Sequence, residues 1–169
     1  MFTPGKRSIL IRLIELNIVA FALAAAVPLR AQSSQFDFHR SIEGAWWVSV
    51  TQYDCATGVK RPPFSSMLLF STGGTLVETT SNPGFLPGQR GTGVGTWARS
   101  EEGTYTASDL AFILFTGGPF QQGTQKLTHS ITLDRDADRF TDEATVQFYD
   151  VTGTLLMSGC ATATASRLH

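Results

Sequence analysis

His129 and Asp142 are the two side chains of this 169-residue sequence best suited to acid–base chemistry. A carboxylate beside an imidazole raises the pKa of the imidazole and fixes its tautomer, as proton transfer requires. The two residues flank a turn near residue 136, and antiparallel pairing around that turn would place them opposite or diagonal to each other. Alternatively, they form a satisfied polar pair in the protein wall, or Asp142 lies at a solvent-exposed mouth.

Glu78 is a further candidate for an interior acid, because it shares one side of a short alternating run with Leu76. It would bind a polar group of a ligand, or else mark a strand end that reaches water. Several aromatic side chains are suited to lining an apolar pocket, with ordinary core packing as the alternative. The residues that we predict to contact a ligand are Trp97, Tyr105, Phe112, His129 and Phe148.

Metal, nucleotide and nucleic-acid sites have no support in the sequence. The run from Asp134 to Asp138 looks like the start of a calcium loop, but Arg139 occupies the required Gly position and Thr145 the bidentate Glu position. A formal net charge of −1 argues against a phosphate-binding surface, which needs clustered Lys and Arg. We therefore expect no metal, no cofactor and no nucleic-acid partner.

Residues 1–31 have the features of a secretory signal peptide. Basic residues at the start precede a mostly apolar run over 16–27, and Ala31 stands at the expected cleavage point, with the alanines at 24–26 as the alternative. A membrane anchor is disfavoured because Glu15 interrupts a run that is shorter than the roughly 20 residues needed to cross a bilayer. We expect a secreted or periplasmic protein with no stable membrane span after cleavage.

Export also bears on the chemical state of the two cysteines. In an oxidising compartment, Cys55 and Cys160 are better explained as a disulfide than as a reactive or metal-binding pair, and two buried free thiols are the alternative. The chain after residue 31 has nine basic and 13 acidic residues, which makes it mildly acidic. We expect a flexible N-terminal segment, 32–41, followed by one domain, 42–169.

The elements that must position these residues are strands. Short runs rich in Val, Thr, Phe, Tyr and Trp alternate with Gly, Pro and Asp clusters, and tight connections between consecutive runs favour antiparallel neighbours. Eight strands in this length favour closure into a barrel, which removes exposed edges. The expected strands are 43–54, 64–71, 74–80, 92–100, 103–109 (separate from or continuous with 111–116), 123–133, 139–149 and 154–167.

Alternation within the last three strands predicts which side chains point inward. Small residues in the last strand would leave space inside the barrel instead of filling it. The predicted inward sets are Gln125, Leu127, His129, Ile131 and Leu133; Phe140, Asp142, Ala144, Val146 and Phe148; and Leu155, Met157, Gly159, Ala161, Ala163 and Ala165.

The two ends of the domain should pair with each other. If the first and last strands are antiparallel neighbours, one register brings Cys55 close to Cys160 and Trp46 close to Arg167. The Gly44-Ala45-Trp46 motif together with Arg167 resembles the lipocalin (calycin) pattern. That resemblance implies a cation–π contact between Trp46 and Arg167 that closes the narrow end of the barrel. The layout is also similar to small exported bacterial lipocalin-like proteins of unassigned activity, and barrel cyclases similar to allene oxide cyclase share the architecture.

The sequence predicts a secreted barrel that binds a small, mostly hydrophobic molecule, because an eight-stranded barrel is wide enough to hold one small ligand. One alternative is a barrel isomerase or cyclase that moves a proton with His129 and either Asp142 or Glu78. Another is a filled barrel that presents the loop from Ser81 to Gly91 to a protein partner, with Phe85 and Leu86 at its centre. Neither the ligand nor the oligomeric state can be deduced from these patterns.

Overall fold

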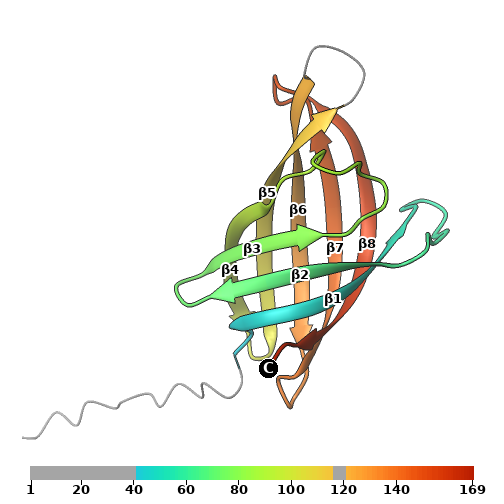
Figure 1. Cartoon of the computed structure of the whole chain (residues 1–169). Coiled ribbons are helices and arrows are strands. Elements are labelled where there is room, and N and C mark those ends of the chain that lie inside the picture. The colour runs from blue at the N-terminus through green and yellow to red at the C-terminus, as the bar shows by residue number, and fades with distance from the viewer. Residues whose placement is uncertain (1–40, 116–120) are drawn as a thin grey trace, which may run out of the picture. The chain divides into compact units, whose positions relative to one another are not determined.

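The computed structural model of the chain describes residues 41–115 and 121–169. These residues form eight strands in one closed antiparallel barrel, in which each strand pairs with the next and β8 returns to pair with β1 (Figure 1). This confirms the expected all-β, eight-stranded up-and-down architecture. The predicted signal peptide, 1–31, and the predicted flexible segment up to residue 40 lie outside the described residues. The strands are β1 (Gly44–Tyr53), β2 (Phe64–Ser71), β3 (Thr75–Thr80), β4 (Gly93–Glu101), β5 (Thr104–Phe115), β6 (Gln121–Leu133), β7 (Arg139–Tyr149) and β8 (Leu155–Arg167).

β5 is one continuous strand, which settles the question left open by the segments 103–109 and 111–116. It pairs with β6 over its whole length, from Thr104 opposite Thr132 to Phe115 opposite Gln121. No helix long and apolar enough to span a membrane occurs within the two described ranges.

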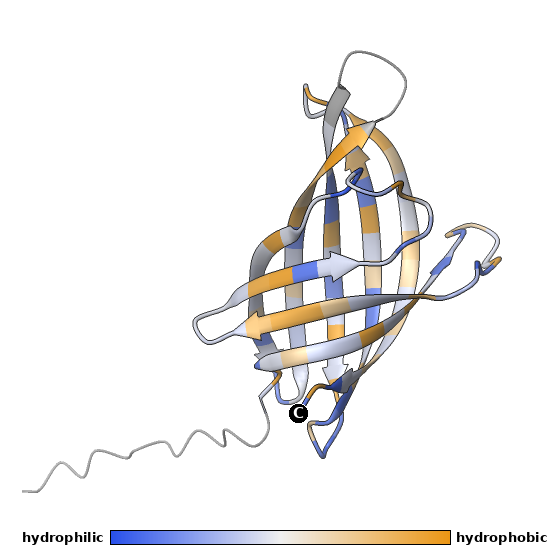
Figure 2. Ribbon diagram, viewed as in Figure 1, coloured by the Kyte–Doolittle hydropathy of each residue, from blue (hydrophilic) through white to orange (hydrophobic). Residues whose placement is uncertain are grey.

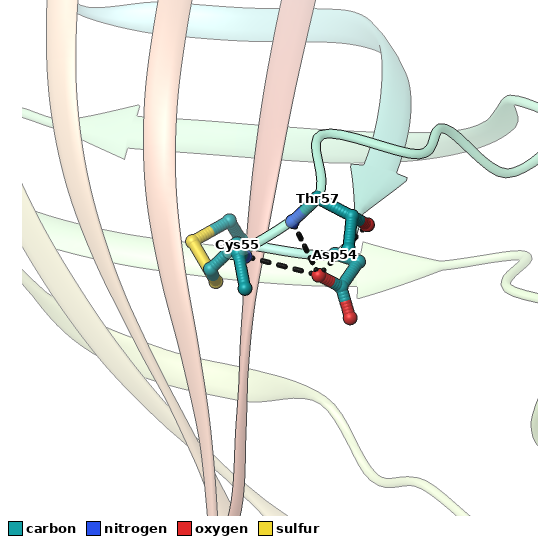
Figure 3. Close-up of a disulfide and its surroundings, with 5 residues drawn as sticks. Asp54, Cys55 and Thr57 are labelled. Carbon is teal, nitrogen blue, oxygen red and sulfur yellow. Dashed lines mark hydrogen bonds between the residues drawn. A yellow bond between two sulfur atoms is a disulfide. The ribbon is translucent and has the colours of Figure 1, made fainter.

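The barrel closes through β1 and β8 in the predicted register. Trp46 lies opposite Arg167, and the pairing continues to Tyr53 opposite Cys160. The predicted disulfide joins Cys55 to Cys160 with a Cα–Cα distance of 5.4 Å, which lies in the usual range for a disulfide. Beside it, Asp54 Oδ1 accepts hydrogen bonds from the backbone nitrogens of Ala56 and Thr57, so the turn that carries Cys55 is itself held in place (Figure 3).

Trp46 and Arg167 close one end of the barrel, as the lipocalin resemblance implied. The guanidinium carbon of Arg167 lies 4.3 Å from the ring centroid of Trp46. Its three nitrogens donate to the backbone oxygens of Ala137, Glu43 and Ser41 at 2.6–2.8 Å. A half-buried guanidinium with every nitrogen bonded avoids the desolvation cost of an unpaired charge.

The packed core fills this same end. It is built around Trp46, whose ring lies 4.8 Å from that of Phe140, and it continues through side chains contributed by all parts of the barrel. Figure 2 shows the apolar and polar residues alternating along β6 and β7, as expected for strands with one face toward a core. The core side chains include Ile42, Phe70, Leu76, Tyr105, Ile131, Leu133, Ala163 and Ala165.

The predicted inward faces are confirmed for β6 and β7, where every residue of the two sets is buried or half-buried. In β8 the small residues Ala161, Ala163 and Ala165 are buried as expected. The expectation is wrong for Leu155 and Met157, which are 48% and 57% exposed. The hairpin of β7 and β8 extends past the shorter strands β2 and β3, so its tip has no opposite wall to pack against (Figure 1).

Candidate functional site

The end of the barrel opposite Trp46 is hollow. It contains an open cup with a cavity volume of about 40 Å³. The wall is mainly apolar and combines β1, β2, β6, β7 and β8. It consists of Val48, Val50, Phe64, Leu68, Phe85, Leu127, Ala144, Val146, Ala161 and Ala163.

The loop between β3 and β4 crosses the mouth of this cup. Near its middle, Phe85 contacts the ring of Phe148 on β7 at 6.4 Å between centroids. At its end, Arg90 forms a bridge with Ile113 of β5. The loop therefore spans from β7 to β5, while Leu86 stays 61% exposed at its tip.

Polar side chains gather at the floor of the cup, in two connected groups. The first group is centred on His129 of β6. Its Nδ1 lies 2.7 Å from Asp142 Oδ2 on β7, and its Nε2 lies 3.1 Å from Asp109 Oδ1 on β5. Asp142 is diagonal to His129, because it pairs with Ile131, two residues further along β6. The predicted proximity of His129 and Asp142 is therefore present, and a second carboxylate completes an Asp–His–Asp arrangement.

The electrostatics of this group make His129 a cation. Burial lowers the pKa of the imidazole, but hydrogen bonds to Asp109 and Asp142 and the charges of both carboxylates more than offset this and raise it to about 10. Because each ring nitrogen has a carboxylate oxygen as its partner, both carry a proton in this state.

The second group is centred on Arg90, which reaches into the barrel from the loop. Its Nη2 forms an ion pair with Glu78 Oε2 at 2.5 Å. Its Nε donates to Gln125 on β6, and Ser66 on β2 donates to the other oxygen of Glu78 at 3.3 Å. Burial raises the pKa of Glu78, and the guanidinium of Arg90 opposes that rise.

Gly93 lets the two groups come together. A Cβ built at this position would lie 2.3 Å from Asp109 Oδ2 and 3.2 Å from Glu78 Oε2. Both carboxylates therefore occupy the space that a side chain on β4 would take. Any larger residue at this position would displace at least one of them.

The predicted ligand contacts divide between the two ends of the barrel. His129 lies at the cup floor. Trp97 and Tyr105 are instead part of the packed end, with ring centroids 5.8 Å apart. Phe148 lies near the mouth, against Phe85. Phe112, also expected to contact a ligand, has a side chain that is 73% exposed, because its neighbours Ala111 and Ile113 face inward along the same strand.

Asp109, Arg90, Gln125 and Ser66 were not predicted as site residues. Asp109 has a signal in the sequence, since continuous alternation from Tyr105 to Ile113 places it inside the barrel. Arg90 has none, because no periodicity governs where a loop side chain points. Among the described residues, no group of three His, Cys, Asp or Glu side chains is arranged to hold a metal ion.

Comparisons with known proteins identify no relative of this chain. No family model, no curated protein and no solved structure matches the chain. The closed eight-stranded antiparallel barrel is consistent with a lipocalin-like fold.

Proposed function

We propose that this chain is a secreted, lipocalin-like barrel that binds one small, mostly hydrophobic molecule in the cup. The observation that carries the proposal is the contrast between the two ends of one interior. One end is filled by Trp46, Phe70 and Phe140, whereas the other has a mainly apolar wall around an open cavity. Apolar pockets with a few placed polar groups are the usual form of small-molecule sites.

Secretion is supported by the cysteine pair. Cys55 and Cys160 form a disulfide, and disulfides persist in oxidising compartments. The proposed location is extracellular or periplasmic.

A neutral hydrophobic fluorophore, N-phenyl-1-naphthylamine, tests the binding function. We expect its emission to rise on mixing with the folded protein and to saturate at one probe per chain. Ala144→Phe would place a ring inside the cup and should abolish the signal, because Ala144 lines the wall. The matched control is Thr145→Phe on the outer face of the same strand, which should leave probe binding unchanged.

Thermal unfolding of both variants shows whether they are folded when probe binding is measured. Equal probe binding by wild type and folded Ala144→Phe would contradict the cup as the binding site. A wild-type protein that excludes the probe, and that retains nothing from a lipid extract, would contradict the carrier function.

The Asp–His–Asp arrangement favours a second candidate, an isomerase or cyclase that folds a flexible substrate in the cup. His129 cannot accept a proton while both ring nitrogens face carboxylates, so the proton acceptor would be the carboxylate of Asp142. Incubating the protein with a lipid extract and searching by mass spectrometry for isomers that do not form with Asp142→Asn tests this candidate. A carrier leaves the composition of the extract unchanged.

A further inference from the structure

The nitrogens of the two cations at the cup floor each have an acceptor nearby. His129 directs Nδ1 to Asp142 and Nε2 to Asp109. Arg90 directs Nε to Gln125, Nη2 to Glu78 and Nη1 to its neighbouring backbone oxygen at 3.1 Å. Every nitrogen of the two cations therefore contacts an acceptor. A ligand carboxylate would have to share both cations with the acceptors that already contact them.

Acceptors, by contrast, remain unused. Among the described residues, no donor reaches Asp142 Oδ1 or Asp109 Oδ2, although both atoms are buried. The side chain of Asp142 is 3% exposed and that of Asp109 is fully buried. A buried carboxylate oxygen without a partner costs free energy, and a donor supplied by a ligand would remove that cost. Of these two residues, Asp142 lines the cup.

The charges point the same way. The floor holds three carboxylates, from Glu78, Asp109 and Asp142, against the two cations Arg90 and His129. With all five ionised, the described part of the cluster has one negative charge in excess. In a low-dielectric interior, such an excess attracts a cation and repels an anion more strongly than it would in water.

We propose that the cup selects an amphiphile whose polar head is a protonated amine, with the ammonium group bound by Asp142 at the floor and the apolar body against the wall. This inference rests on the proposed binding function and specifies its ligand class. An ammonium group brings three donors and no acceptor, so it matches the unpartnered acceptor oxygens of the floor. A carboxylate head has the opposite properties and meets an excess of its own charge.

Three ligands with the same chain and different heads test the proposal: octylamine, 1-octanol and octanoate. Near pH 7 their heads are cationic, neutral and anionic. Isothermal titration of the folded protein should give a dissociation constant for octylamine about tenfold or more below that of 1-octanol, with octanoate the weakest. Octanoate or 1-octanol binding as tightly as octylamine would overturn the ligand class and leave the carrier function standing. Failure of all three ligands would overturn both.

Variants at two adjacent positions locate the amine. Asp142→Asn should weaken octylamine about tenfold or more and change the affinity for 1-octanol little, because it removes charge but keeps shape. Glu143→Gln is the matched control: it removes the same charge one residue away on the exposed face of β7 and should bind octylamine as the wild type does. An equal loss in both variants would mean general charge attraction and would overturn the assignment to Asp142. If Asp142→Asn does not fold, the wild-type ligand series still decides the proposal.

Discussion

His129 lies between two carboxylates with both ring nitrogens engaged, so its charge state depends on two opposing effects. Burial disfavours the imidazolium, and the oxygens of Asp142 and Asp109, 2.7 and 3.1 Å away, favour it. The carboxylates prevail and raise the pKa of His129 to about 10. The residue thus acts as a buried cation that allows two acids to approach each other inside the barrel.

This charge state makes stability depend on pH. Below about pH 6.5 the folded and unfolded states both hold the proton of His129, and its stabilising contribution is complete. Above that value the unfolded chain releases the proton first, so the free energy of unfolding should fall as the pH rises toward 10. Each pKa unit is worth about 1.4 kcal/mol, so the total fall should amount to a few kcal/mol.

Urea unfolding at pH 6, 8 and 9.5 measures this fall, and His129→Gln, which cannot titrate, should lack it. An imidazole nitrogen spectrum that shows His129 losing its proton near pH 6.5 in the folded state would contradict the assignment.

The position of His129 relative to Asp142 was predictable because a tight turn joins their strands. A short hairpin fixes the register, and alternation then gives the face of each residue. Glu78 was likewise predictable as an interior residue from its phase with Leu76. Arg90 was not, since its entry into the barrel depends on the path of a whole loop. The composition of the first group could thus be predicted in part, and the second group only through its acid.

At the level of elements, β5 explains the two main errors. Treating 103–109 and 111–116 as possibly separate strands discards the alternation that runs through Tyr105, Ala107, Asp109, Ala111 and Ile113, all of which are buried. If the inward–outward alternation continues along the whole of β5, Asp109 points into the barrel and Phe112 points outward. The missed acid and the misplaced aromatic residue therefore have one cause. A polar residue in the middle of a strand does not end it when a cation is available inside the barrel.

The packing where β3, β4 and β5 contact one another at Gly93 should be sensitive to one added methyl group, which should lower stability. Gly93→Ala would place a Cβ 2.3 Å from Asp109 Oδ2, so the carboxylate must move. We expect a loss of about 1–3 kcal/mol in the free energy of unfolding, the usual cost of overpacking. Gly91→Ala is the control, because its nearest neighbour, the Phe112 oxygen, would be at an ordinary 3.7 Å. Urea unfolding compares the two, and equal losses would contradict this role for Gly93.

For the whole molecule, the closure of the barrel was the most predictable feature. The pairing of Trp46 with Arg167 and the linking of Cys55 with Cys160 require one register between the first and last strands, and the structure has it. The hollow end was less predictable. Inward-facing Ala residues indicate space, but whether side chains from the opposite wall fill that space depends on strand tilt and loop path, which alternation does not specify.

The disulfide spans 105 residues of sequence and should stabilise the barrel mainly by restricting the unfolded chain. β1 and β8 remain joined by their own pairing, so the reduced protein should still fold into a closed barrel. Cys55→Ser combined with Cys160→Ser should lower the free energy of unfolding by up to about 5 kcal/mol, the chain-entropy value for a loop of this length. Neither cysteine lines the cup, so the folded double variant should bind N-phenyl-1-naphthylamine as the wild type does.

Urea unfolding and probe titration at the same temperature separate the effect on stability from the effect on binding. Probe affinity that falls together with stability in the folded variant would show that the disulfide shapes the cup and would contradict this division of roles.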